Sequence, residues 1–282
     1  MATPFHSGEM AVQARAGVQT LAGQVGRMIQ PGIPAVAQQF LSHQTMLIVG
    51  ASDPSDSIWA SLLRGPAGFL TVVDDTNLRV QAVPVHGDPL DGHLSRGSHV
   101  GLLAIEFETR RRMRINGRVT DNRDGHWSVQ IEEAYSNCPK YIRTRGPMIQ
   151  GAGPHSREMH SADGISEAQQ RWLAQADTFF IASAHPQGGA DASHRGGKPG
   201  FVQVLDAHAL QWPDYAGNNL FQTLGNLSVN PGAGLLFVDF DRGGTLQLTG
   251  HAELLWETGQ GSTVPETGRS IRFHIQRVVE LR

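Results

Sequence analysis

The chain has 282 residues, of which 39% are hydrophobic, and its formal net charge is -3 at pH 7. It is long enough for one large or two ordinary packed domains, and it lacks the overall positive charge that would attract nucleic acid or an anionic membrane. No apolar run approaches the roughly 20 residues that span a bilayer, and residues 1–17 contain no signal-peptide core, so we expect a cytoplasmic protein. The single cysteine, Cys138, excludes an internal disulfide and a four-cysteine zinc or iron–sulfur site.

The first half begins with a helical extension at residues 1–34, followed by a short helical pattern at 35–41. Runs rich in β-branched and aromatic residues then predict strands at 45–51 and 69–73, separated by turns that contain Asp, Gly and Pro. Cys138 precedes a proline, and no neighbouring residue indicates a reactive thiolate, so we interpret this stretch as a turn.

Polar and apolar side chains alternate along the strand predicted at 112–119. The polar positions are repeated later in the chain: Arg112, Arg114, Asn116 and Arg118, and then Thr245, Gln247, Thr249 and His251. We expect these strands to keep one face in solvent. The run at residues 110–112 is interpreted as a charged sheet edge that discourages pairing with other sheets.

The second half repeats the order of elements found in the first. Ser166 is predicted to cap a helix at 166–173, and strands are predicted at 178–184, 201–205 and 245–252. No G-x-G-x-x-G motif follows a strand, and no β-α-β alternation is present, so a Rossmann domain is not expected. Short strands with only brief helices predict a mainly β protein built from small antiparallel barrels.

An internal repeat relates the two halves. Eight residues recur 132 positions later: Leu41, Val49, Ser61, Gly65, Gly68, Phe69, Asp74 and Leu78 are matched by Leu173, Ile181, Ser193, Gly197, Gly200, Phe201, Asp206 and Leu210. A second block, with Gly101, Phe107 and Gly117, recurs 133 positions later. We therefore expect two homologous units at 35–145 and 165–282, joined by a Gly-, Pro- and Ser-containing linker at 146–164.

Several motifs of the second unit resemble the flavin-nucleotide-binding proteins of the pyridoxamine 5'-phosphate oxidase superfamily. They are Asp177-Thr178-Phe179-Phe180-Ile181-Ala182-Ser183, Ser193-His194-Arg195-Gly196-Gly197-Lys198-Pro199-Gly200-Phe201, Trp212-Pro213-Asp214-Tyr215, Gly217-Asn218-Asn219, Leu224-Gly225-Asn226-Leu227 and Gly234-Leu235-Leu236-Phe237-Val238-Asp239-Phe240. The first half carries a thinner resemblance in Phe5-His6-Ser7-Gly8-Glu9, Arg112-Met113-Arg114-Ile115-Asn116-Gly117 and Tyr135-Ser136-Asn137-Cys138-Pro139-Lys140-Tyr141-Ile142. The resemblance implies Greek-key split barrels with FMN bound between two of them. A homodimer usually supplies that pair, whereas a tandem chain can form it internally as a pseudo-dimer.

The same resemblance implies an FMN-binding flavoprotein, expected to be an oxidoreductase. It would transfer hydride or electrons between a reduced nicotinamide nucleotide, or a partner reductase, and an unidentified small substrate. No pyridoxal-phosphate site is identified, so pyridoxamine-phosphate oxidase activity itself is not expected. The alternative is a non-catalytic flavin- or nucleotide-binding module that acts as a sensor or binds a partner. A third alternative is that the chain binds haem or a deazaflavin instead of FMN. The association of two tandem chains as a homodimer is left open.

A phosphate site is predicted at the glycine-rich segment that begins with Ser193 and His194. Arg195 and Lys198 would supply positive charge, and the neighbouring glycines would let backbone N–H groups approach the anion. The alternative is a basic hairpin turn in solvent. The first unit has Leu62-Leu63-Arg64 in place of His194-Arg195-Gly196, so we expect one flavin site per chain with the first unit as its opposite wall.

The remaining candidates surround this segment. Asn218 and Asn219 precede an apolar helical pattern and are expected to cap a helix whose N-terminus attracts phosphate. Thr223 and Asn226 are assigned to the same groove, although Asn226 also suits a turn. Gln247 and its counterpart Arg114 are assigned as flavin contacts, with a solvent-exposed strand face as the alternative. Trp212 and Tyr215 are aromatic candidates that either stack on the flavin ring or pack in the core. The 13 histidines lack metal-ligand spacing, so no metal is predicted.

Overall fold

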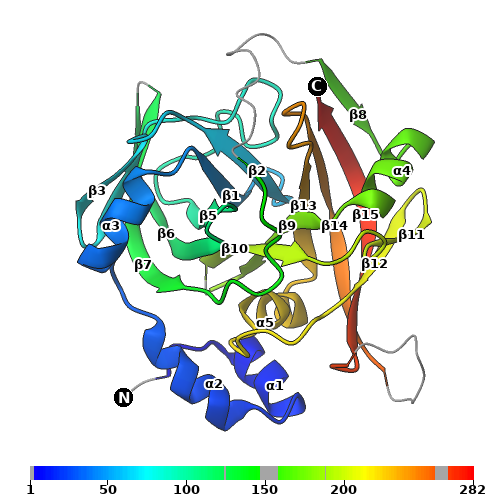
Figure 1. The fold of residues 1–282 in the computed structure, drawn as a ribbon, viewed down its shortest axis with the longest axis horizontal. Coiled ribbons are helices and arrows are strands. Elements are labelled where there is room, and N and C mark those ends of the chain that lie inside the picture. Colours follow the sequence, from blue (N-terminus) through cyan, green and yellow to red (C-terminus); the bar gives the residue numbers. More distant parts are fainter. Residues whose placement is uncertain (1–2, 124, 147–157, 188, 258–265) are drawn as a thin grey trace.

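The computed structural model describes residues 3–123, 125–146, 158–187, 189–257 and 266–282. Two antiparallel sheets form most of it, and the helices lie at their margins (Figure 1). The predicted mainly β fold is therefore confirmed. Residues 147–157, which make up most of the predicted linker, lie outside the described residues.

The first sheet has the strand order β2-β1-β5-β6-β7-β4-β3. Its strands are β1 (Met46–Ser52), β2 (Ile58–Arg64), β3 (Leu70–Asp74), β4 (Asn77–Val80), β5 (His99–Glu106), β6 (Arg111–Arg123) and β7 (His126–Ser136). The strands predicted at 45–51, 69–73 and 112–119 are thus present as β1, β3 and β6.

The second sheet has the order β10-β9-β13-β14-β15-β12-β11. Its strands are β9 (Thr178–His185), β10 (Gly189–Gly196), β11 (Gln203–Asp206), β12 (Ala209–Pro213), β13 (Gly232–Val238), β14 (Thr245–Trp256) and β15 (Arg269–Leu281), and β8 (Met159–Ala162) pairs with β15. Each strand of the first sheet has its counterpart eight strands later, in the same place in the order. The same strand order in both sheets is what the internal repeat in the sequence predicts.

The helices are short: α1 (Ser7–Arg15), α2 (Gln19–Val25), a 3-10 turn at Gly26–Met28, α3 (Ala35–Ser42), α4 (Glu167–Gln175) and α5 (Gln222–Val229). Ser166 caps α4 as predicted, and Gln169 completes a capping box with it. Among the described segments, no helix combines the length and apolar character needed to cross a membrane. The second unit places α5 between β12 and β13, whereas the first unit has an irregular loop, 81–98, between β4 and β5.

Each sheet encloses its own apolar core, and a third core lies between the sheets. In this third core, Ile48 and Leu103 of the first unit pack with Phe180 and Leu236 of the second. The units approach closely because glycines face each other's strands. A Cβ on Gly101 would lie 2.5 Å from the backbone of Asp191, and the counterpart Gly234 stands in the same relation to Trp59. The pairing of the two units is therefore reciprocal, as in a dimer.

Two expectations about strand faces are wrong. Strand β6 lies between β5 and β7, so residues 110–112 do not form a sheet edge. The middle of the polar faces of β6 and β14 is also not solvated: Arg114 is 9% exposed and Gln247 is fully buried, whereas Arg118 and His251 further along the strands are exposed. The physical reason is that the other unit covers these faces. An alternating pattern within one strand does not show which other part of the molecule packs against it.

Candidate functional site

A solvent-accessible pocket lies where the first unit meets the second, with a cavity volume of about 140 Å³. The first unit contributes residues of β6 and of the segment that follows β7, and the second contributes β10, the loop 213–221 and the start of α5. Most of the side chains that line it are cationic, polar or aromatic, with Arg112, Arg114, His194, Arg195 and Thr223 among them.

Three arginines converge on this pocket with little negative charge to balance them. Arg114 forms an ion pair with Asp191, at 3.2 Å between Nη1 and Oδ1. Arg112 donates instead to the His194 ring and to the Cys138 carbonyl oxygen, each at 2.9 Å, and Arg195 donates to the His194 carbonyl oxygen at 3.1 Å. Within the described part of the chain, neither Arg112 nor Arg195 has a carboxylate at ion-pair distance.

The unbalanced charge is costly to bury. Burial, together with the neighbouring Arg114 and Arg195, lowers the pKa of Arg112 to about 9. Burial also lowers the pKa of Arg195, although the charge of Asp214 opposes this change. Cations that lose solvent without gaining a partner are destabilising until an anion binds between them. These two guanidinium groups therefore favour an anionic ligand.

His194 supplies a neutral donor to the same region. Its Nδ1 lies 2.9 Å from Arg112 Nη1, and a guanidinium only donates, so Nδ1 accepts and the ring hydrogen is on Nε2. Burial and the surrounding arginines hold the pKa of His194 well below its usual range. Among the described residues, Nε2 has no hydrogen-bond partner, and neither do Arg112 Nε, Arg114 Nε or Asn137 Nδ2. A bound molecule rich in acceptor oxygens would satisfy such donors.

Helix α5 begins at the pocket wall without a side-chain cap. Its first residues, Gln222, Thr223 and Leu224, line the pocket, and the preceding Phe221 adopts a left-handed conformation with φ of 61°. The expectation that Asn218 or Asn219 caps this helix is wrong, because Asn218 Oδ1 accepts from the N–H of Leu220 instead. The first-turn N–H groups of an uncapped helix attract anions.

The structure brings most of the predicted site residues together. Those that line the pocket are Arg114, His194, Arg195, Asn218, Asn219 and Thr223. Ser193 lies directly behind them: its hydroxyl donates to Asp191 Oδ2 at 2.8 Å and is 2.7 Å from the Thr223 hydroxyl. Ser193 thus helps to place Asp191, the ion-pair partner of Arg114.

Three predicted residues lie elsewhere. Lys198 is exposed in the turn after β10, and Asn226 contacts His6 and Ser183 on the side of α5 away from the pocket lining. Gln247 donates to Ala60 O, Ser61 Oγ and Asp88 Oδ2, which belong to the reciprocal contact between the units. Arg112 also lines the pocket but was not among the predicted site residues. Its position two residues before Arg114, on the same face of the strand, could have indicated it.

The rim of the pocket joins the two units. Tyr141 stacks on Tyr215 with ring centroids 5.1 Å apart, and the Tyr141 hydroxyl donates to Ala216 O at 3.0 Å. Asn218 Nδ2 donates to Asn137 Oδ1 at 2.8 Å. Trp212, the other aromatic candidate, is instead buried in the second core against Phe179.

The reciprocal groove is built differently. Leu62 and Leu63 occupy the positions of His194 and Arg195, and Thr245 and Gln247 occupy those of Arg112 and Arg114. In place of α5, the loop 81–98 enters the groove, where Asp88 accepts a hydrogen bond from Ser61 Oγ at 2.6 Å. Leu90 and Leu94 of this loop are buried. The reciprocal groove therefore presents apolar and neutral groups where the pocket presents cations.

Most of the second unit is similar to a known protein family. Residues 165–273 match the family model described as pyridoxamine 5'-phosphate oxidase. No curated protein matches the chain.

Solved structures of similar fold include three with low identity. HupZ from Group A Streptococcus is 18% identical, with 40% of this chain and 92% of that chain covered and a TM-score of 0.33. An FAD-binding protein from Mesorhizobium loti is 12% identical, with 44% and 98% covered and a TM-score of 0.29. An FMN-binding protein from Syntrophomonas wolfei subsp. wolfei is 11% identical, with 40% and 89% covered and a TM-score of 0.27.

The matched residues include β10, the loop before α5 and α5 itself, which form one whole side of the pocket. The second unit of this chain is therefore similar to the pyridoxamine 5'-phosphate oxidase family, whose model matches residues 165–273.

Proposed function

We propose that the chain binds FMN, with its phosphate in the pocket between the two units. The observation that carries this proposal is the placement of Arg112 and Arg195, half-buried and without a carboxylate partner among the described residues, beside the uncapped start of α5. A phosphate dianion matches two guanidinium groups in charge and matches free N–H groups in hydrogen bonding. The family of the second unit supports a flavin as the molecule that carries the phosphate.

Each residue has a separate task in this proposal. Arg112 and Arg195 neutralise the phosphate, and the Nε2–H of His194 donates a further hydrogen bond. Arg114 Nη1 is held in place by Asp191, Tyr135 and Gln222, and its Nε, which has no partner among the described residues, is available to a bound molecule. When bound, FMN supplies hydride or single-electron transfer.

We further propose an oxidoreductase that receives electrons from a reduced nicotinamide nucleotide or a partner reductase and passes them to a small substrate. We also propose that the two homologous units span residues 35–145 and 165–282. A binding module without turnover is the second candidate, because Asp214, the carboxylate that lines the pocket, is already paired with Arg269 at 2.8 Å. That pairing leaves it poorly suited to act as a general base.

The test is a measurement of FMN binding with matched arginine variants. The purified protein is examined by visible absorption, the released ligand is identified by chromatography, and the dissociation constant is measured by quenching of FMN fluorescence. Arg195→Gln is expected to weaken FMN binding by about tenfold or more, because a charge-assisted contact is worth about 1.5–3 kcal/mol. Arg79→Gln, on an exposed position of β4, is the control.

A folded wild-type protein that neither contains nor takes up FMN would refute the proposal. Release of haem or of a deazaflavin would replace FMN by that ligand. Reduction of the bound flavin by NADH or NADPH, followed by repeated turnover with an added electron acceptor, would support the oxidoreductase. Tight binding without reduction by either nucleotide or by a reductase would support the binding module.

A further inference from the structure

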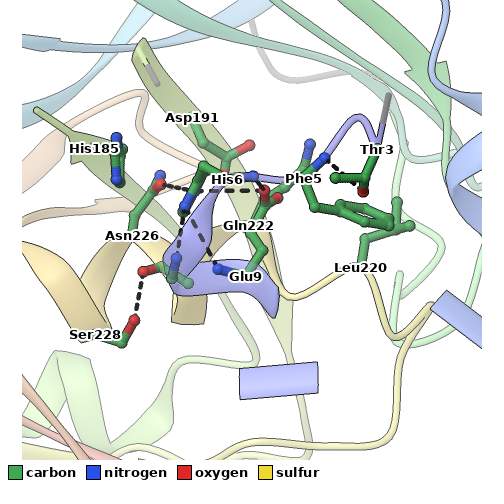
Figure 2. A network of polar contacts seen from close by, with 12 residues as sticks. Thr3, Phe5, His6, Glu9, His185, Asp191, Leu220, Gln222, Asn226 and Ser228 are labelled. Carbon is green, nitrogen blue, oxygen red and sulfur yellow. Dashed lines mark hydrogen bonds and ion pairs between the residues drawn. The ribbon is translucent and has the colours of Figure 1, made fainter. Parts of the chain in front are cut away.

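The N-terminal helix α1 packs directly against α5 (Figures 1 and 2). The first residues of α5 line the pocket. The two helices cross at a pair of glycines. A Cβ on Gly8 would overlap the carbonyl oxygen of Gly225, and a Cβ on Gly225 would lie 2.5 Å from the Glu9 side chain. Backbone therefore touches backbone, and the crossing has no room for a methyl group.

Polar contacts tie the start of α1 to α5 (Figure 2). The backbone N–H of Gly8 donates to His6 Nδ1 at 3.1 Å, so the His6 ring hydrogen is on Nε2, which donates to Asn226 Oδ1 at 2.9 Å. Burial, followed by the charge of His185, lowers the pKa of His6 and favours this neutral form. Asn226 in turn donates to Ser183 on β9. One imidazole thus links the α1 cap to the middle of α5.

A third contact reaches the turn that precedes α5. Asn219 and Phe221 both adopt left-handed backbone conformations, with φ of 62° and 61°. This conformation is common for asparagine but strained for a bulky residue such as Phe221, where it persists only if the surroundings hold it. Between them, the carbonyl oxygen of Leu220 accepts a hydrogen bond from Gln13 Nε2 of α1 at 3.0 Å, and the Leu220 side chain packs with Phe5.

We propose that residues 5–15 are a positioning element of the phosphate pocket: through Gly8, His6 and Gln13 they hold the strained turn 219–221 and the start of α5 where a phosphate can be bound. This inference rests on the proposed function, because it assigns the phosphate of FMN to the uncapped start of α5. It predicts that damage to the α1 contacts weakens the grip on the phosphate and leaves contacts with the rest of the flavin unchanged.

Glu9 adds a pH dependence to this element. It is 3% exposed, and burial, with further effects of Glu133 and Asp191, raises its pKa to about 8 even though the His6 N–H and Arg114 favour ionisation. This raised pKa favours the protonated carboxyl near neutral pH. Ionisation of Glu9 above about pH 8 adds a buried negative charge near Glu133 and Asp191, which weakens the docking of α1.

The experiment compares FMN with riboflavin, which lacks the phosphate. Gln13→Leu removes the hydrogen bond to the strained turn, Gly8→Ala forces the helices apart, and Gly23→Ala in α2 is the control because a Cβ there meets no atom within 4 Å. We expect Gln13→Leu and Gly8→Ala to reduce the preference for FMN over riboflavin by about tenfold, since a displaced helix N-terminus loses its interaction with the anion. Gly23→Ala should keep the wild-type preference.

Hydrogen exchange of the protein without ligand gives a second readout. The backbone amides of residues 222–225 should exchange faster in Gln13→Leu than in the wild type or in Gly23→Ala. This comparison does not use Gly8→Ala, so it still applies when that variant does not fold. Equal preferences and equal exchange in Gln13→Leu and the control would overturn the positioning role while FMN binding by the wild type still stood. A wild type that binds neither flavin would instead refute the proposed function.

Discussion

The two grooves between the units share their strands and differ in what fills them. The cationic pocket has Arg112, His194 and Arg195 around a cavity, whereas the reciprocal groove has Thr245, Leu62 and Leu63 around the loop 81–98. A symmetric dimer must have the same groove twice. A tandem chain is free to keep a polar groove on one side and to fill the other with its own side chains, which gains apolar burial.

The first test of this comparison converts the pocket into its counterpart. His194→Leu combined with Arg195→Leu places the residues of the reciprocal groove in the pocket. We expect FMN affinity to fall by about 100-fold or more, because loss of one charged and one neutral contact costs about 3 kcal/mol. The affinity is measured by titration of FMN fluorescence.

The stability of the same double variant provides the control. Without ligand, its melting temperature should equal or exceed that of the wild type, because the change removes a cation that has no carboxylate partner among the described residues. A folded variant with wild-type FMN affinity would show that the phosphate lies elsewhere.

A second test adds one methyl group at each of two equivalent glycines. Gly101→Ala presses on the backbone of Asp191 behind the pocket, and Gly234→Ala presses on Trp59 behind the reciprocal groove. Each is expected to lower the free energy of unfolding by about 1–3 kcal/mol through overpacking. Only Gly101→Ala should also weaken FMN binding, since Asp191 holds Arg114. Equal effects of both variants on FMN affinity would contradict the assignment of the site to one groove.

A third test uses pH. The pKa of Glu9 is raised from 4.5 to about 8 in the folded protein, so the folded state binds the proton more tightly than the unfolded state. The contribution of this carboxyl to stability is therefore complete below about pH 4.5 and is lost as the pH rises to about 8. Relative to Glu9→Gln, the wild type should lose at most about 1.4 kcal/mol per pH unit across that interval. Denaturant unfolding at pH 5, 6.5 and 8 measures the difference, and a constant difference would contradict the raised pKa.

The smallest effect is expected at Lys198. The sequence assigns it to the phosphate, but the structure places its side chain in solvent, outside the pocket lining. Lys198→Ala should change FMN affinity by less than about twofold at 0.15 M salt, where exposed charges are screened. A loss as large as that of Arg195→Gln would show that the turn after β10 folds over the ligand.

Sequence alone predicted the features that depend on local order. The runs of β-branched residues located β1, β3 and β9, and Ser166 marked the start of α4. The repeat predicted two units, and the two sheets share one strand order. His194 and Arg195 were identified because they follow a strand within a recognisable motif. In these cases the signal and the structure lie in the same stretch of chain.

Tertiary structure decided which side chains share a groove. Gln247 and Arg114 are equivalent in the repeat, and for that reason they lie in different grooves: reciprocal pairing brings β6 to β10 and β14 to β2. The same pairing partly covers Arg112, which the pattern of its own strand predicted to be exposed. It also brings α1 to α5 across more than 200 residues of sequence. Periodicity within a strand reports which face a residue is on, and only the packing of one unit against the other determines what that face meets.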